Sequence, residues 1–403
     1  MNAFEDKLRV ASMEWVGAGV ITGEQRTAIL ARHPAKTGSG GRFIGIVATV
    51  GGLLFAVGVS LVIKANWESL EDWTKIAGLV ALLVASYVAG WKLKLAGDHL
   101  PKTGDVCLMM GGVFFLCGIA LVSQIFHLNS RPATGLFVWW LGIVAVPWLT
   151  QAKGAQFLSI VAGLVWLGYE MVTPGSWIEF ASRASGFGHD PVGVVAVYFF
   201  LGLALWMSGL GMNNTRWSDF AGMHEKWGIV LTFGSLYWLG FTRHAWNSTR
   251  HGLARVDPTS LLAVGMGVVL AGVAVVAAWH RSQREIRSLL PWIAIALVPT
   301  LGVFSGPLGD GGWLWSGLAW VALFVLSVGT VRVGLESGRE GWVNLGILAI
   351  AINVVTRYFD LFGSILEGGV FFIVSGVLVT ALGIFLERKR RLLLTALREE
   401  PQP

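Results

Sequence analysis

Charged residues are scarce in this chain. Asp, Glu, Lys and Arg make up 13% of its 403 residues, whereas soluble domains carry about 25%. Hydrophobic residues make up 54%. The sequence therefore predicts a protein whose surface lies largely in a lipid bilayer.

Cysteine is scarcer still. Cys107 and Cys117 are the two in the chain, ten residues apart in one apolar segment. This spacing places them on different faces of a helix, so we expect buried, inert thiols. No second histidine with ligand spacing lies near His127, and the sequence therefore predicts neither a metal site nor a cofactor.

Motifs of known membrane enzymes are also missing. The chain has no HExxH, no GxSxG and no paired aspartates within an apolar run,. The glycine-rich stretch 37–41, TGSGG, lacks the GKS or GKT ending of a phosphate-binding loop,. We therefore expect no enzymatic activity, and the placement of the basic residues explains the net charge of +6 without a nucleic-acid partner.

Long apolar runs are what the sequence has instead. About twenty apolar residues span a bilayer as a helix. The sequence predicts an all-α, polytopic membrane bundle of about 12 transmembrane helices. The predicted runs are 43–63, 76–95, 106–126, 136–150, 156–173, 191–211, 227–242, 259–279, 289–304, 313–332, 342–358 and 368–386. Of these, 136–150, 227–242 and 289–304 are short, and prolines predict bends in the first and last of the three.

The basic residues predict the orientation of these runs. If the N-terminus is cytoplasmic and all runs cross, 22 of the 30 Lys and Arg residues fall on the cytoplasmic side. This is the positive-inside bias, and it favours an even number of spans. We therefore expect a multi-pass inner-membrane protein with both termini in the cytoplasm.

Two polar segments flank the predicted bundle at 42–387. Residues 1–41 are predicted to form a cytoplasmic helical hairpin with a Gly/Ser linker. Gly17 and Gly19 interrupt its first helix, and Thr22 with Gln25 three positions later predicts a capping box at the start of the second,. We expect the hairpin to dock on the membrane bundle or on a protein partner. The basic tail 388–403 is expected to anchor on anionic lipid.

Small residues recur at intervals of about four positions in two apolar runs. Ala48, Gly52, Ala56 and Ser60 form one ridge, and Ala263, Gly267, Ala271, Ala274 and Ala278 form another. Such ridges let helix backbones approach closely in lipid. We expect seams within the molecule, and a seam between two copies in a homo-oligomer is the alternative.

Polar side chains gather where odd-numbered runs end. In the predicted orientation these ends lie on the extracytoplasmic side, and polar groups at membrane depth usually face a bundle interior or a wet cavity. The candidate ligand-binding residues are Lys64, Asn66, Gln124, His127, Glu170, Asn353, Arg357 and Asp360.

The last three candidates form a stripe on one helix. At 100° per residue, Asn353, Arg357 and Asp360 lie within about 60° of one another. Arg357 and Asp360 can pair at i, i+3, which lowers the cost of burying the arginine. Two interpretations stay open: a functional pocket, or a structural pair that holds helices together near the interface.

Four stretches of the sequence resemble a known family. They are WVGAGVITGEQRTAIL and GGLLFAVGVSLVIKANW near the N-terminus, SQIFHLN after the third run, and TRYFDLFGSILEGGVFFIVSGVLVTALGIFLERKRR near the C-terminus. The chain resembles the bacterial predicted membrane proteins of domain-of-unknown-function family 2157. The resemblance implies a bacterial inner-membrane location and supplies no catalytic residues.

Three functional hypotheses follow. The leading one is a transporter-like or small-ligand-binding membrane protein with an extracytoplasmic polar pocket. The second is a non-catalytic scaffold or assembly factor that acts through the N-terminal hairpin. The third is a lipid- or glycan-handling enzyme, which would need carboxylates such as Glu170, Asp360 or Glu367 at the level of the lipid head groups.

Overall fold

A computed structural model describes most of the chain. The predicted run 43–63, the linker 37–41 and most of the run 368–386 lie outside the described residues. The described residues are 11–13, 15–32, 69–96, 100, 101–128, 130–173, 191–213, 215–241, 258–280, 282–302, 312–362 and scattered positions between 373 and 392.

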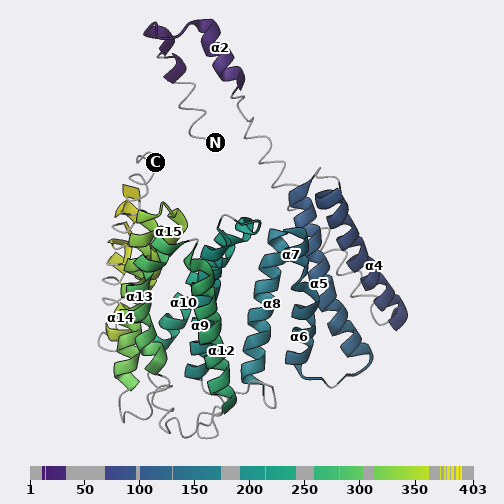
Figure 1. The fold of residues 1–403 in the computed structure, drawn as a ribbon. Helices are drawn as coiled ribbons and strands as arrows, with labels where there is room; N and C mark the ends of the chain where they lie inside the picture. The colour runs from purple at the N-terminus through teal and green to yellow at the C-terminus, as the bar shows by residue number, and fades with distance from the viewer. Residues whose placement is uncertain are drawn as a thin grey trace. The chain divides into compact units, whose positions relative to one another are not determined.

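The chain divides into two compact units, Met1–Lys75 and Ile76–Pro403. Within the described residues every regular element is a helix (Figure 1). The all-α class predicted from the apolar runs is therefore confirmed.

The described part of the first unit is helical on both sides of a tight turn. Residues 15–17 are helical, and Gly19 follows with a φ of 69°. The Val20 amide donates to the Trp15 carbonyl at 2.9 Å, and the Gly19 amide donates to the Val16 carbonyl at 3.1 Å. This is a Schellman motif, in which glycine supplies the left-handed residue that ends a helix.

Helix α2 (Gly23–Arg32) begins with the predicted capping box. The Gln25 amide donates to Thr22 Oγ1 at 3.2 Å, and the Thr22 amide donates to Gln25 Oε1 at 2.9 Å. These two bonds satisfy amides that the first turn leaves without intrahelical partners. The full hairpin stays a prediction because residues 1–10 are outside the described part.

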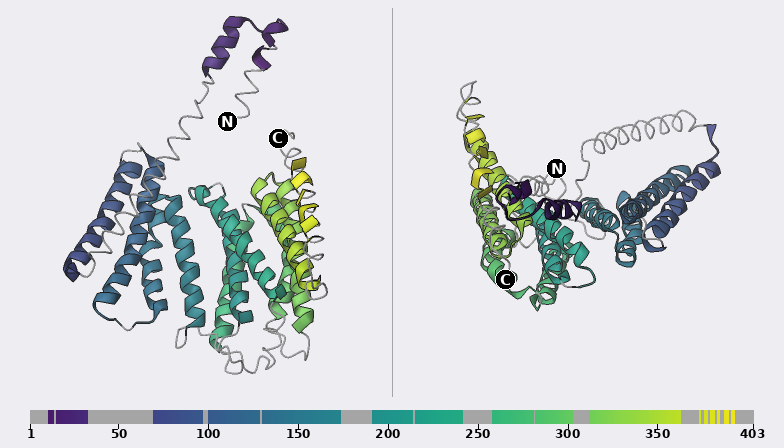
Figure 2. Two further views of the ribbon diagram at one scale, coloured as in Figure 1. Left: turned by 180° about the vertical axis from the view of Figure 1, so that it is seen from behind. Right: turned by 90° about the horizontal axis from the view of Figure 1, so that it is seen from above.

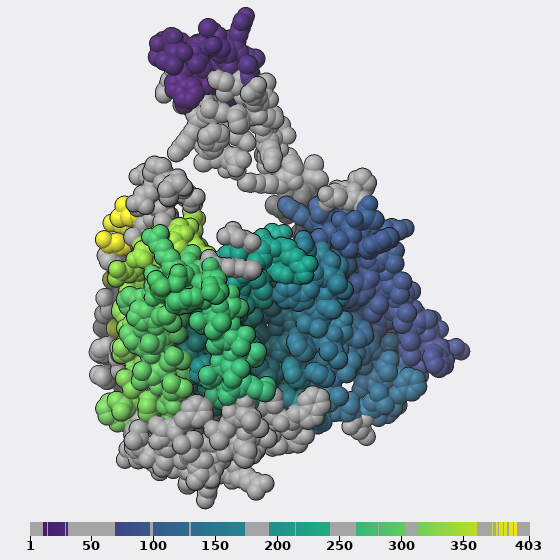
Figure 3. Space-filling view, viewed as in Figure 1, coloured from purple at the N-terminus to yellow at the C-terminus, as the bar shows by residue number. Residues whose placement is uncertain are grey.

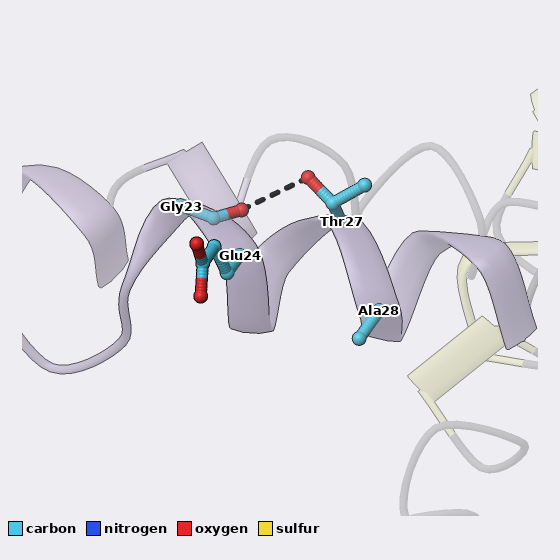
Figure 4. A pocket seen from close by; sticks show the side chains of 4 residues that line it. All are labelled: Gly23, Glu24, Thr27 and Ala28. Carbon is cyan, nitrogen blue, oxygen red and sulfur yellow. Dashed lines mark hydrogen bonds between the residues drawn. The ribbon is translucent and has the colours of Figure 1, made fainter.

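A shallow hollow lies on the surface of α2, lined by Gly23, Glu24, Thr27 and Ala28 (Figure 4). All four residues are exposed. The Thr27 hydroxyl donates to the Gly23 carbonyl of its own helix at 2.9 Å, so its proton is already used. The hollow holds no buried polar group aimed at a ligand, and we assign it no function.

The second unit holds the helices that coincide with the predicted runs. Each run from 76–95 to 342–358 falls on a helix. The helices are α4 (Asp72–Gly90), its continuation η2 (Trp91–Ala96), α5 (Pro101–Ile125), α6 (Pro132–Ile143), α7 (Val146–Thr150), α8 (Lys153–Val172), α9 (Pro191–Met212), α10 (Ser218–Phe241), α12 (Pro258–Trp279), α13 (Gln283–Leu301), α14 (Gly312–Glu336) and α15 (Glu340–Phe362).

Seven candidate spans among the described residues are long and apolar enough to cross a membrane. They are Asp72–Ala96, Pro101–Ile125, Pro132–Thr150, Lys153–Val172, Gly193–Met212, Trp313–Glu336 and Glu340–Asp360. Helix α12 contains a shorter apolar stretch, Ala263–Trp279. The chain is thus a multi-pass membrane protein by composition, and the count of twelve spans stays a prediction.

Proline interrupts the short run 136–150. Helix α6 ends at Ile143, and α7 starts at Val146 with Pro147 in its first turn. Proline lacks the amide that would continue the hydrogen-bond ladder, so the helix breaks just before it. Val144 and Ala145 keep right-handed helical dihedrals between the two helices, and α6 and α7 together form one candidate span. The bend itself stays a prediction.

Within the second unit, α4–α8 and α9–α15 form two groups of helices (Figure 2). Glycines bring the first group together. A Cβ on Gly90 of α4 would lie 2.6 Å from the Leu108 side chain of α5, and a Cβ on Gly142 of α6 would lie 2.3 Å from the Phe115 ring of α5. Such close approach supplies the van der Waals contact that holds helices together in lipid.

The second group has the larger core. Helix α9 lies at its centre, against α10, α12 and α13. Trp206 of α9 and Trp342 of α15 are almost fully buried there, and their ring centroids lie 5.3 Å apart. The α9–α10 backbones are so close that a Cβ on Gly228 would lie 2.3 Å from the Trp206 backbone nitrogen.

The small-residue ridge of α12 packs against α9. Gly267 lies beside Phe200, and Ala278 lies beside Gly211. This ridge is therefore a seam within the molecule, as predicted. Sequence numbers rise together along both helices, so α9 and α12 run parallel, as expected if α10 crosses between them.

The opposite face of α12 is apolar and exposed, and part of the α12 surface is visible in Figure 3. Its exposed side chains are Met266, Val268, Val269, Leu270, Val273 and Val276, each at least 42% exposed. Exposed apolar surface of this extent is expected where a helix faces lipid.

The two helix groups meet where α8 lies against α10, and a hydrogen bond also joins α8 to α9. Tyr198 of α9 donates its hydroxyl proton to the Leu164 carbonyl of α8 at 2.7 Å. The rings of Phe157 on α8 and Trp227 on α10 have centroids 5.8 Å apart. We call this contact the α8–α10 seam.

Candidate functional site

The predicted polar stripe on α15 is buried at Asn353 and Arg357 and reaches the surface at Asp360. Asn353 is 1% exposed and Arg357 is 9% exposed. Asn353 Nδ2 donates to the Trp320 carbonyl of α14 at 3.2 Å. Arg357 pairs with Asp360 through Nη1 and donates from Nη2 to the Gly240 carbonyl of α10 at 2.7 Å. The stripe therefore connects three helices.

Helix α10 presents its C-terminal end to Arg357. The last four carbonyls of a helix lack intrahelical partners and carry partial negative charge. Gly240 is the penultimate residue of α10, and its carbonyl accepts both from Arg357 and from the Ser316 hydroxyl of α14. The arginine thus satisfies an orphan acceptor and complements the helix dipole.

Two aromatic rings lie against the guanidinium of Arg357. Its Cζ lies 4.8 Å from the Phe241 ring centroid and 5.1 Å from the Trp320 ring centroid. Cation–π contacts of this kind stabilise an arginine that has lost its water. They also keep the guanidinium in a fixed plane between α10 and α14.

Two hydrogen-bond donors in this group have no acceptor. Arg357 Nε and Trp320 Nε1 are buried and make no hydrogen bond. A buried donor without a partner costs about 1–3 kcal/mol, and such groups call for a water or ligand as an explanation. The Asp360 side chain beside them is 46% exposed, so the group reaches the surface of the helix bundle.

Gln124 and His127 lie elsewhere, at the end of α5. Both are exposed. Helix α5 ends at Ile125, and His127 has a φ of 48°, with Nδ1 within 3.2 Å of the Ile125 carbonyl. Gln124 and His127 therefore do not share one continuous helical face, because the helix ends between them.

Glu170 belongs to the first helix group. Its side chain is 2% exposed, and Oε1 lies 3.9 Å from Arg131 Nη1. Arg131 immediately precedes α6. The described contacts place Glu170 with α6 and α8, and Asn353, Arg357 and Asp360 with α10, α14 and α15. Lys64 and Asn66 lie outside the described residues, as does Glu367.

A second cluster of charged side chains, toward the opposite end of α10, was not predicted from the sequence. Arg339, between α14 and α15, pairs with Glu225 of α10 and lies 3.7 Å from Glu285 of α13. Trp342 Nε1 donates to Glu225 Oε2 at 2.9 Å. Arg339 and Glu225 are 114 positions apart, so only the three-dimensional fold brings them together.

The cysteines differ from their prediction. Cys107 is half-buried and Cys117 is exposed. Their ten-residue separation turns one toward neighbouring helices and the other outward on α5, so the expectation of two buried thiols was wrong. Among the described residues, no group of three or more His, Cys, Asp or Glu side chains is arranged to hold a metal ion.

Comparison with known protein families identifies the N-terminal part of the chain. Residues 13–156 match the family described as "Predicted membrane protein (DUF2157)". We call residues 13–156, which match this family model, the DUF2157 region. This region runs from the helix before α2 into the first turn of α8, and the resemblance predicted from the sequence is confirmed there.

The α15 stripe lies outside the DUF2157 region, as does the C-terminal stretch that also suggested the family. No curated protein and no solved structure matches the chain. The comparisons thus indicate a membrane protein and give no activity. A function can be inferred only from the buried polar groups of the structure.

Proposed function

We propose that the protein is a transporter-like or small-ligand-binding inner-membrane protein that binds an anionic group beside Arg357. In the predicted orientation this site lies at the extracytoplasmic end of α10 and α15. The observation that carries the proposal is the pair of buried donors without acceptors, Arg357 Nε and Trp320 Nε1.

The charge of the group supports an anion over a neutral ligand. Arg357 stays protonated in proteins, and its one described carboxylate partner, Asp360, is 46% exposed. An exposed carboxylate is screened by water and compensates a buried cation only weakly. An anion that enters beside Arg357 would accept from its Nε and add the missing counter-charge.

The surrounding residues would orient such a ligand. Ser316 donates to the Gly240 carbonyl of α10, and Asn353 donates one hydrogen bond to the Trp320 carbonyl of α14. These two residues hold the helices, and Arg357 and Trp320 supply the donors without acceptors. Asp360 would fix the guanidinium through Nη1. A clamp without a ligand would use the same contacts, and the two interpretations differ only in whether the orphan donors are filled.

Thermal unfolding of the purified full-length protein with added anions tests the proposal. Chloride, acetate, sulfate and inorganic phosphate are the added anions. A ligand at 100 times its Kd stabilises the folded state by about 2.7 kcal/mol. We expect at least one anion to raise the Tm of the wild type, and the rise to disappear in Arg357→Met.

Arg332→Met is the matched control, because Arg332 is exposed and pairs with Glu336 within its own helix. Trp320→Phe keeps the ring and removes the orphan donor, so it should weaken the anion response even if Arg357→Met fails to fold. An equal Tm rise in all variants, or no rise in the wild type with any of the four anions, would show that Arg357 is only a helix clamp.

A further inference from the structure

A buried histidine lies at the α8–α10 seam, away from the Arg357 site. His224 of α10 and Gln156 of α8 are 5% and 3% exposed. His224 Nε2 lies 2.7 Å from Gln156 Nε2, and Nδ1 lies 2.9 Å from the hydroxyl of Ser208 on α9. This network therefore joins the two helix groups. Gln156 is also the last residue of the DUF2157 region.

The hydrogen bonds define a neutral imidazole. Ser208 Oγ donates its hydrogen to the Leu205 carbonyl at 2.8 Å. It must therefore accept the hydrogen bond from Nδ1–H of His224. Gln156 Nε2 can only donate, so Nε2 of His224 accepts. One atom is then left over: Gln156 Oε1 is buried and has no hydrogen-bond partner.

The unpartnered oxygen of Gln156 could accept a hydrogen bond from a protonated histidine. Rotation of the Gln156 amide by 180° exchanges its oxygen and nitrogen. The oxygen would then accept from an Nε2–H of His224, while Nδ1–H still donates to Ser208. The network can therefore hold the imidazole in its neutral or its protonated form with both ring nitrogens bonded.

We propose that His224, Gln156 and Ser208 form a proton-binding site, and that proton uptake at His224 Nε2 loosens the α8–α10 seam. The proton comes from solution and converts a neutral imidazole into an imidazolium, with no other bond broken. The site is separate from the anion site and stands or falls independently of it.

The charges around His224 do not compensate an imidazolium. On α8 and α10, Lys153 and Asp219 pair with each other at 3.0 Å and are both more than half exposed. Glu225 points to Arg339 and Trp342, and Lys226 is exposed. Helix α9 has no charged residue, and α7 contributes the ring of Trp148, whose centroid lies 6.2 Å from that of His224.

Burial therefore lowers the pKa of His224 from 6.5 to about 4, in the second turn of α10 before the apolar run predicted at 227–242. A group whose pKa is lower in the closed seam than in water binds its proton more readily when the seam opens. The closed seam is fully stable above about pH 6.5 and loses stability as the pH falls toward 4. One such proton changes the closed-to-open ratio by up to about tenfold per pH unit.

Thermal unfolding of the full-length protein between pH 7.5 and 4.5 tests this inference. We expect the wild-type Tm to fall below pH 6.5 and His224→Gln to remove most of that fall, because glutamine bonds the same partners without titrating. His127→Gln, at an exposed histidine, is the matched control and should keep the wild-type pH profile.

Hydrogen exchange on the wild type provides a second measurement that needs no variant. After correction for the intrinsic rate, amides of 153–160 and 220–230 should exchange several-fold faster at pH 5 than at pH 7, relative to those of α14. The inference is wrong if the exchange of these amides does not speed up relative to α14 at pH 5. It is also wrong if His224→Gln folds and keeps the full wild-type pH dependence of the Tm.

Discussion

The carboxylate of Glu225 is nearly enclosed, and each of its oxygens accepts a hydrogen bond. Arg339 donates to Oε1 and Trp342 donates to Oε2, and the Glu225 side chain is 7% exposed. Glu285 interacts with the same arginine at 3.7 Å but is 23% exposed. The two carboxylates therefore share a partner and differ in burial.

This difference predicts unequal effects of the same substitution. Removal of one partner from a buried charge pair costs about 3–5 kcal/mol. A longer ion pair that keeps contact with water, as Glu285 does at 3.7 Å from Arg339, contributes about 0–1 kcal/mol. We expect Glu225→Gln to lower the stability of the folded protein by several kcal/mol and Glu285→Gln by less than about 1 kcal/mol. Unfolding of both variants in mixed micelles measures this, and equal losses would contradict it.

The α15 stripe was predictable because its residues lie on one helix. The spacing of Asn353, Arg357 and Asp360 follows from helical geometry alone. Their partners were not predictable, because two of them are backbone carbonyls, of Gly240 and Trp320. Every residue has a carbonyl, so no sequence pattern marks the one that an arginine on another helix will reach.

At the scale of the elements, the contact between α9 and α10 depends on glycine. A Cβ on Gly228 would meet the Trp206 backbone at 2.3 Å, whereas a Cβ on Gly222 of the same helix meets nothing within 4 Å. The clash at Gly228 involves backbone atoms, so it cannot be relieved by a change of rotamer.

Gly228→Ala should therefore force α9 and α10 apart. Overpacking typically costs about 1–3 kcal/mol, and a backbone clash belongs at the upper end. Gly222→Ala is the matched control and should be neutral or stabilising by up to about 1 kcal/mol, because alanine favours helix over glycine. Thermal unfolding of both variants checks this, and a neutral Gly228→Ala would show that the helices are less tightly packed than described.

Sequence patterns predicted the elements more fully than their packing. Apolar runs gave the positions of α4 to α15, Pro147 gave the break between α6 and α7, and Thr22 with Gln25 gave the start of α2. These are local properties of the chain. The end of α5 at Ile125 also agrees with the predicted run 106–126 to within one residue.

At the scale of the whole molecule, the division of the second unit into two helix groups has no counterpart in the sequence. The groups are joined at the seam between α8, α9 and α10. In lipid, apolar side chains face other helices or acyl chains with equal ease, so hydropathy does not say which helices are neighbours. The parallel α9 and α12 do agree with the alternating crossings that the basic residues predict.

The predicted orientation can be tested by reporter fusions. A fluorescent protein fused after Pro403 should be bright, because the basic residues after the last run predict a cytoplasmic C-terminus. Alkaline phosphatase fused between α8 and α9, near residue 182, should be active, because the predicted topology places this loop on the extracytoplasmic side. Phosphatase activity at the C-terminus or its absence near residue 182 would contradict the predicted topology.

Helices α10 and α15 run parallel and are joined at both ends by arginines. Arg339 holds Glu225 near the start of α10, and Arg357 holds Gly240 near its end. Fifteen residues separate the two points on α10, a rise of about 22 Å. The two arginine contacts therefore require a fixed number of residues between Glu225 and Gly240. One residue inserted there would shift one end of α10 by about 1.5 Å along its axis and rotate it by about 100°. Only one of the two arginines could then keep its partner. We therefore expect α10 to tolerate substitutions at many positions, but no insertion or deletion between Glu225 and Gly240.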